Sequence, residues 1–125
     1  MAINIDFNRV ADPIATSMGI GLNYSLAKRF NGESIEPGLG YTLHSEIAYS
    51  LNDKWVLTER LEYDRQPNIF MQNSFTMQTE NVDQAYLTHS IVYNPTKTGN
   101  VYSLQLSLGL NDASTGLIVS VGVQR

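Results

Sequence analysis

The chain has 125 residues, which suffices for one domain and is too few for two independent cores, so residues 1–125 are expected to form a single domain. Charged residues make up 16% of the chain, well below the roughly 25% of ordinary soluble proteins. The net charge of −4, with only eight Lys plus Arg, argues against nucleic acid as a partner. The absence of cysteine removes disulfides, thiolate catalysis and Cys-ligated zinc.

The ends of the chain and its apolar runs limit how it could meet a membrane. Residues 1–7 carry neither the basic nor the apolar region of a signal peptide, so we expect either a mature protein or one that is not exported. No apolar run approaches the roughly 20 residues of a transmembrane helix. A membrane-spanning role would therefore require a closed β-barrel.

Alternation of apolar and polar residues predicts about eight strands and no helix. In chain order they are expected near residues 3–9, 14–31, 38–51, 54–66, 69–78, 84–93, 102–110 and 116–125. The turn-forming Asn-Asp pair at 52–53 predicts a hairpin, and Pro67 ends the strand that follows it.

The segment 102–110 has the cleanest alternation of all. Tyr102, Leu104, Leu106, Leu108 and Leu110 form one set, and Ser103, Gln105, Ser107 and Gly109 form the other. We predict an antiparallel up-and-down β-barrel, although the period alone also permits a soluble sandwich. Two features favour the barrel: the polar face is mostly small and neutral, and aromatic residues lie toward strand ends, at Phe30, Tyr41, Tyr49, Trp55, Tyr63, Tyr93 and Tyr102.

The C-terminal third also carries a family resemblance. The stretch 93–98, the segment Leu106-Ser-Leu-Gly-Leu-Asn-Asp-Ala-Ser-Thr-Gly116 and the strand 119–123 resemble the C-terminal end of outer-membrane transporter-like β-barrels. The hairpin 47–55 is similar to their periplasmic hairpins. The resemblance implies an outer-membrane location and a lipid bilayer or detergent as partner. The end Val123-Gln124-Arg125 lacks the terminal aromatic of such barrels, which leaves open a fragment, a homo-oligomeric barrel or a non-membrane β-assembly.

Charged residues converge on the polar faces of two neighbouring predicted strands. We expect them to form an interior polar network: His44, Glu46, Arg60, Glu62 and Asp64. Charges in a narrow lumen must pair, so a salt-bridge network is the first interpretation. A His/Glu acid–base pair is the second, but no nucleophile stands beside it. Two histidines without ligand spacing predict no metal site, and no motif predicts a cofactor.

Two residues interrupt the aliphatic faces. Glu59 lies among Trp55, Leu57 and Leu61, and His89 lies within the aliphatic set of its own strand. A charge facing lipid is costly near the midplane and cheap near the interface, so these residues lie near a rim or the face contacts protein. The expected function is that of a non-enzymatic barrel with a structural or transport-associated role. Contact of this face with protein would favour an alternative function. That alternative is a self-assembling structural β-protein, such as a coat or tube subunit of an extracellular or virion particle.

Overall fold

The computed structural model describes residues 2–24, 28–30, 33–67, 69–72, 76–78, 80–95 and 99–124, and it describes no side chain of 28–30, 33–37, 69–72 or 76–78. Every regular element within these ranges is a β-strand. Over the same residues, no helix has the length and hydropathy needed to cross a membrane.

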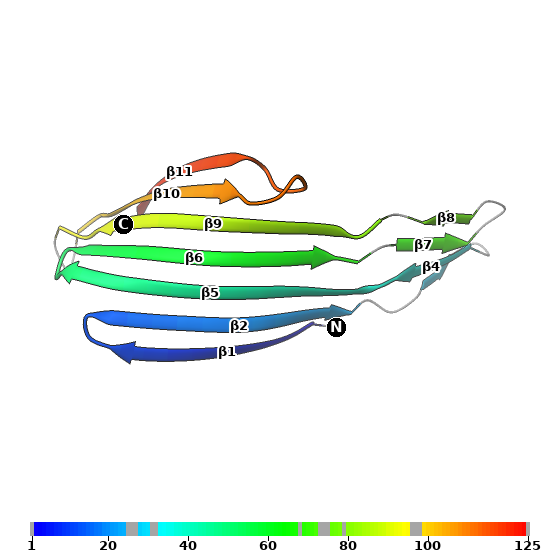
Figure 1. Cartoon of the computed structure of the whole chain (residues 1–125), viewed down its shortest axis with the longest axis horizontal. Helices are drawn as coiled ribbons and strands as arrows, with labels where there is room; N and C mark the ends of the chain where they lie inside the picture. Colours follow the sequence, from blue (N-terminus) through cyan, green and yellow to red (C-terminus); the bar gives the residue numbers. More distant parts are fainter. Residues whose placement is uncertain are drawn as a thin grey trace.

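Seven long strands form one antiparallel sheet (Figure 1). In spatial order they are β1 (Ala2–Ala11), β2 (Ile14–Tyr24), β5 (Leu39–Asn52), β6 (Trp55–Gln66), β9 (Val82–Tyr93), β10 (Val101–Gly109) and β11 (Leu117–Gln124). Each strand pairs with the next one of this series along the chain, which is the up-and-down order expected from the sequence. The sheet is open, because β1 and β11 are its two edges.

Four short strands form a second antiparallel sheet in the order β3 (Lys28–Phe30), β4 (Glu33–Pro37), β7 (Ile69–Gln72) and β8 (Thr76–Gln78). They belong to the connections from β2 to β5 and from β6 to β9. In Figure 1, β4 and β7 continue beyond the ends of β5 and β6. The main sheet therefore carries an extension at one end.

The two ends of the main sheet differ in their connections. At one end the turns are short, at 12–13 and 53–54, with a longer segment at 94–100. At the other end the chain forms the second sheet and the loop 110–116. Asn52 stabilises the turn at 53–54, since its Oδ1 accepts hydrogen bonds from the backbone N–H of Lys54 at 2.9 Å and of Trp55 at 3.1 Å. We call these the short-turn end and the long-loop end.

Strand register separates the sheet into two chemically different faces. Paired residues share a face, and the pairings Ile20↔Leu43, Leu43↔Tyr63 and Leu57↔Ile91 place aliphatic and aromatic side chains together. This apolar face continues through Leu104↔Val121 at the last strand pair. The polar face carries the pairings Ser17↔Glu46, Glu46↔Arg60 and Gln105↔Ser120.

The described residues contain no buried hydrophobic side chain. Leu104 is 49% exposed and Val121 is 77% exposed, although both lie in the middle of long strands. A water-soluble domain of this size normally buries its apolar face against a second layer. The apolar face is therefore not covered by any described part of the chain.

Six of the eight predicted strands agree with the structure. The strand expected over residues 14–31 is wrong in its second half, because β2 ends at Tyr24 and Lys28–Phe30 belongs to the second sheet, whose strand β4 was not predicted. The single strand expected over residues 69–78 is also wrong, because β7 and β8 pair with each other there, with Phe70 opposite Gln78. Turn-forming residue types at Asn73-Ser74 interrupt the alternation there, and residues 73–75 lie outside the described set. The predicted end at Asn31-Gly32 also lies outside it, as does the side chain of Phe30.

Candidate functional site

Arg60 is the centre of an ion cluster on the polar face. Its Nη2 lies 2.6 Å and its Nε lies 3.1 Å from one carboxylate oxygen of Glu62, two residues along β6. Its Nη1 lies 3.5 Å from Glu46, its register partner on β5. The structure thus brings together three of the five residues expected to form the network. Their side chains are 32–40% exposed, because nothing described covers this face.

His44 has a different partner from the one expected. Its register partner on β6 is Glu62, yet its Nε2 lies 3.3 Å from the carboxylate of Asp6 on β1. The strand between them, β2, presents Gly19 at this level. A Cβ at Gly19 would lie 2.2 Å from Asp6 Oδ1 and 2.3 Å from His44 Cε1. Because Gly19 has no side chain, Asp6 on β1 and His44 on β5 can form an ion pair across β2.

Asp64, the fifth predicted residue, is separate from both groups. It accepts a hydrogen bond of 2.7 Å from the hydroxyl of Thr42, its register partner. Further along the polar face, the hydroxyls of Thr88 and Ser107 are 2.9 Å apart, and Ser107 is 9% exposed. These two line a hollow of about 310 Å³ together with Arg60, Glu62, Tyr86, Gln105 and Ile118.

The charged side chains on the polar face pair with one another. Arg60 is shared by two carboxylates, and His44 is oriented by a third. A general base needs a reacting proton within hydrogen-bond reach, and no described hydrogen bond joins His44 to a hydroxyl. Within the described residues, no group of three or more potential ligands is placed to hold a metal ion.

The sequence did not indicate Asp6 or Thr42 as members of these contacts. Asp6 alternates with Ile5 and Phe7, which places it on the polar face of the N-terminal strand. Pairing it with His44 requires the register of three strands, and a single strand's alternation does not contain that information. In the sequence, Gly19 is the residue that could have indicated this contact, because a strand position without a side chain leaves room for a neighbour's side chain to reach across it.

Aromatic residues form two bands on the apolar face. At the short-turn end, Tyr93 stacks against Trp55 at a centroid distance of 4.3 Å and lies 6.3 Å from Tyr102. At the long-loop end, Tyr41 and Tyr63 are 5.9 Å apart. Along β6 the bands are eight residues apart, or about 26 Å at a rise of roughly 3.3 Å per residue.

Charged residues follow directly beyond each band. At the long-loop end, Arg65 and Asp83 are register partners, with Arg65 Nε 3.6 Å from the Asp83 carboxylate. The guanidinium carbon of Arg65 also lies 6.0 Å from the centre of the Tyr41 ring. At the short-turn end, Asp53 and Lys54 occupy the hairpin turn. The apolar band thus has an aromatic and then a charged boundary on both sides.

Glu59 and His89 form an ion pair on the apolar face and are register partners on β6 and β9. Glu59 lies four positions from Trp55 and four from Tyr63 along β6, midway between the aromatic bands. The pair therefore lies at mid-strand, away from both aromatic bands. The two side chains satisfy each other and are 42% and 39% exposed.

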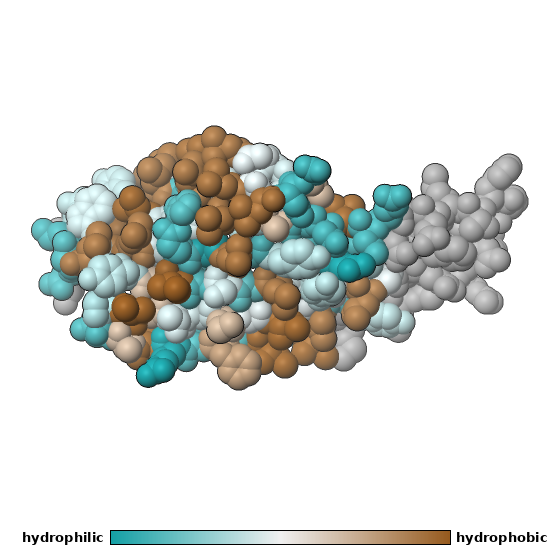
Figure 2. Space-filling model, in the orientation of Figure 1, coloured by the Kyte–Doolittle hydropathy of each residue, from teal (hydrophilic) through white to brown (hydrophobic). Residues whose placement is uncertain are grey.

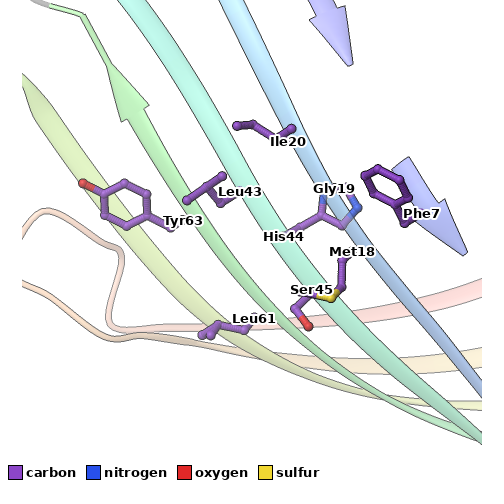
Figure 3. Close-up of a pocket in the computed structure, with 9 residues that line it drawn as sticks. All are labelled: Phe7, Met18, Gly19, Ile20, Leu43, His44, Ser45, Leu61 and Tyr63. Carbon is purple, nitrogen blue, oxygen red and sulfur yellow. The ribbon is translucent and has the colours of Figure 1, made fainter. Parts of the chain in front are cut away.

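A shallow hollow of about 430 Å³ lies on the apolar face where Ser45 sits between longer neighbours (Figure 3). Ser45 pairs with Met18 on one side and Leu61 on the other. The remaining lining comes from β1, β2, β5 and β6: Phe7, Gly19, Ile20, Leu43, His44 and Tyr63. The hollow is almost wholly apolar. His44 and Gly19 also border it, although their register positions belong to the polar face of the sheet.

No protein-family model and no curated protein sequence matches the chain.

Proposed function

We propose that the seven-stranded sheet is the wall of an outer-membrane-type β-barrel of about eight strands. Its apolar face contacts lipid, and its polar face lines the interior. The barrel has a structural or transport-associated role and performs no catalysis. The observation that carries this proposal is the apolar band between two aromatic bands about 26 Å apart along the strand.

The dimensions of the band fit a bilayer. Strands of membrane barrels tilt by about 35–45°, which would shorten the projected separation to roughly 20 Å, and their apolar bands are about 25 Å tall between aromatic girdles. Arg65 and Asp83, just beyond Tyr63, would then lie at the level of the lipid headgroups. Short turns at one end and long connections at the other also match the asymmetry of such barrels.

Exposure of the apolar face supports the same proposal. Leucine and valine side chains at the centres of β10 and β11 are exposed, and no described layer covers them. In water a continuous apolar face of this extent leads protein molecules to associate, whereas in a bilayer the same face contacts the hydrocarbon of the lipid. An interior lined by the Arg60 cluster would be filled by side chains, because eight strands leave no aqueous channel.

The direct test is behaviour in detergent and lipid. The protein is expected to stay dispersed only with detergent or phospholipid vesicles, and to migrate differently on gel electrophoresis before and after boiling. Monodisperse behaviour in plain buffer at high concentration would contradict the membrane assignment.

One observation favours a second function, that of a self-assembling structural subunit. The Glu59–His89 pair lies in the middle of the apolar band, where a lipid-facing charge is most costly. Contact with a neighbouring protein would supply polar partners there. Large regular particles or tubes formed without detergent would support this alternative.

A further inference from the structure

The two edge strands of the main sheet are long and regular. β1 pairs with β2 at ten consecutive positions, and β11 pairs with β10 at eight. In an antiparallel ladder, alternate residues direct both N–H and C=O away from the partner. Each edge therefore presents a row of backbone groups that no described strand satisfies.

Both edges lack proline and bulges, two of the features that normally prevent further pairing. Exposed edges of soluble proteins are blunted by proline, bulges or inward-pointing charges. β1 and β11 contain no proline, and their registers run without a shift, unlike the bulge of β5 at Ser50–Asn52. β11 has no charged residue, whereas β1 carries Asp6 on the polar face and Arg9 on the apolar face. Figure 2 shows hydrophobic atoms over β10 and β11 and again over β1 and β2. Both edges are thus suited to being paired.

Strand direction determines what can pair with them. Six successive antiparallel pairings connect β1 to β11, so these two strands run in the same direction. If β11 joined β1 directly, the seam would be parallel. The same holds for β11 of one copy against β1 of another copy, provided that both copies have the same orientation in a membrane.

We propose that β1 and β11 bind, on their free edges, one extended polypeptide strand that runs opposite to both and closes the sheet as an eight-stranded barrel. The proposal rests on the membrane function proposed above, because a bilayer requires every backbone N–H and C=O to be paired. One strand is the smallest number that makes the closure antiparallel throughout.

The edge residues define the chemistry of this strand. On the apolar side it lies beside Ile3, Ile5, Val119 and Val121, so its outward residues are mainly aliphatic. Arg9 is on the same side of β1, so a polar or acidic residue fits the strand at that level. On the polar side it lies beside Asn4, Asp6 and Ser120, together with Gly122, so its inward residues are small and polar. Its length is about ten residues, equal to that of β1.

Space on the polar face favours one strand over three or more. Gly19 and Gly21 on β2, and Gly122 on β11, are already overlain by the side chains of Asp6, Asn4 and Ser103 from adjacent strands. Such close overlap on the inward face is expected of a narrow barrel whose lumen is filled by side chains. A wider barrel would leave a water-filled interior.

The proposal can be tested by adding either one or two strands to the chain. The segment Ile14–Tyr24 already pairs with β1, so a second copy of it, fused after Arg125 through a short Asn-Gly turn, provides an eighth strand of the required direction. The matched control fuses copies of both Ile14–Tyr24 and Ala2–Ala11, which restores a parallel seam. In phospholipid vesicles the one-strand fusion is expected to give a boiling-sensitive, fast-migrating band, with at least a severalfold loss of this band in the two-strand fusion.

Cysteine cross-linking provides an independent measurement on the unfused chain, which has no native cysteine. Ile5→Cys combined with Val119→Cys or Val121→Cys should give little cross-link in vesicles. Efficient intramolecular cross-linking would mean that β1 pairs with β11, and efficient intermolecular cross-linking would mean that a second copy closes the sheet. Either result, or equal band formation by both fusions, would overturn the eighth strand and leave the membrane function standing. Failure of every variant to associate with vesicles would overturn both.

Discussion

Asp6 and His44 form an ion pair across an intervening strand, with His44 Nε2 3.3 Å from Asp6 Oδ1 above Gly19. The contact links the edge strand β1 to β5, which is not its neighbour in the sheet. Since β2 is the one described strand that pairs with β1, this ion pair is a second point of attachment for the edge.

Gly19→Val is expected to break this attachment. The added Cβ would lie within 2.3 Å of atoms of both side chains, so at least one must move away. Overpacking of this kind typically costs about 1–3 kcal/mol. Urea unfolding in detergent micelles measures the loss.

Gly116→Ala is the matched control, because a Cβ at Gly116 meets nothing within 4 Å. It should unfold like the native protein. In a His44→Ala background the cost of Gly19→Val should shrink, since one of the two obstructed groups is gone. An unchanged cost in that background would show that the ion pair is not what Gly19 protects.

Arg60→Ala is expected to leave Glu46 and Glu62 without their shared cation. If the polar face is the interior of a barrel, removing one member of a buried pair should cost about 3–5 kcal/mol of unfolding free energy. If the face is solvated, the cost should stay below about 1 kcal/mol. Lys54→Ala, at the exposed hairpin turn, controls for loss of a positive charge. A near-neutral Arg60→Ala in lipid would contradict the interior assignment.

The local pattern of the sequence was sufficient to predict most of the sheet. Alternation such as that of Leu104, Leu106 and Leu108 against Gln105 and Ser107 repeats every two residues, so it identifies a strand and its faces without a partner. The up-and-down order followed because short turns such as Asp53-Lys54 join neighbouring antiparallel strands.

The contacts that depend on register could not be predicted in the same way. His44 was expected near Glu46 and Glu62, but its ion pair is with Asp6, whose position depends on the β1–β2 and β2–β5 registers together. Register is a non-local property, and a slip of one residue would reverse every face. The short hairpin of β7 and β8 was missed because the turn-forming residues Asn73-Ser74 were taken as part of one strand.

The Glu59–His89 pair distinguishes lipid from protein as the neighbour of the apolar face. In a bilayer, the double variant Glu59→Leu/His89→Leu should be at least as stable as the native protein, because replacing a desolvated ion pair by apolar residues is often neutral or stabilising by about 1–4 kcal/mol. The single variant Glu59→Leu should be less stable than either, since His89 then lacks its partner. Unfolding in vesicles provides the comparison.

The adjacent pair on the same face supplies a control. Leu57 and Ile91 are register partners, and Leu57→Ile with Ile91→Leu preserves the apolar volume. This exchange should leave stability nearly unchanged. If the Glu59/His89 double variant instead loses stability or abolishes an ordered assembly, a protein partner recognises the pair and the face does not meet lipid.

The facing of β10 can be tested at two adjacent residues. Leu106 lies on the apolar face in register with His89, and Gln105 lies on the polar face between Ser90 and Ser120. Leu106→Lys should destabilise the barrel by roughly 2–4 kcal/mol in bilayers, as expected for lysine facing lipid near the midplane. Gln105→Lys should be limited by interior space, whereas in a soluble sheet it would meet water and cost almost nothing.

Spin labels at the same two positions report facing without relying on stability. For a membrane barrel, the Leu106 label should be accessible to oxygen, which partitions into lipid, and shielded from water-soluble relaxation agents. A packed soluble sheet gives a different pattern, because protein covers the apolar face and water reaches the polar one. Full water accessibility at Gln105, together with a Leu106 label shielded from both reagents, would therefore reject the membrane barrel in favour of an assembly in which apolar faces pack against each other.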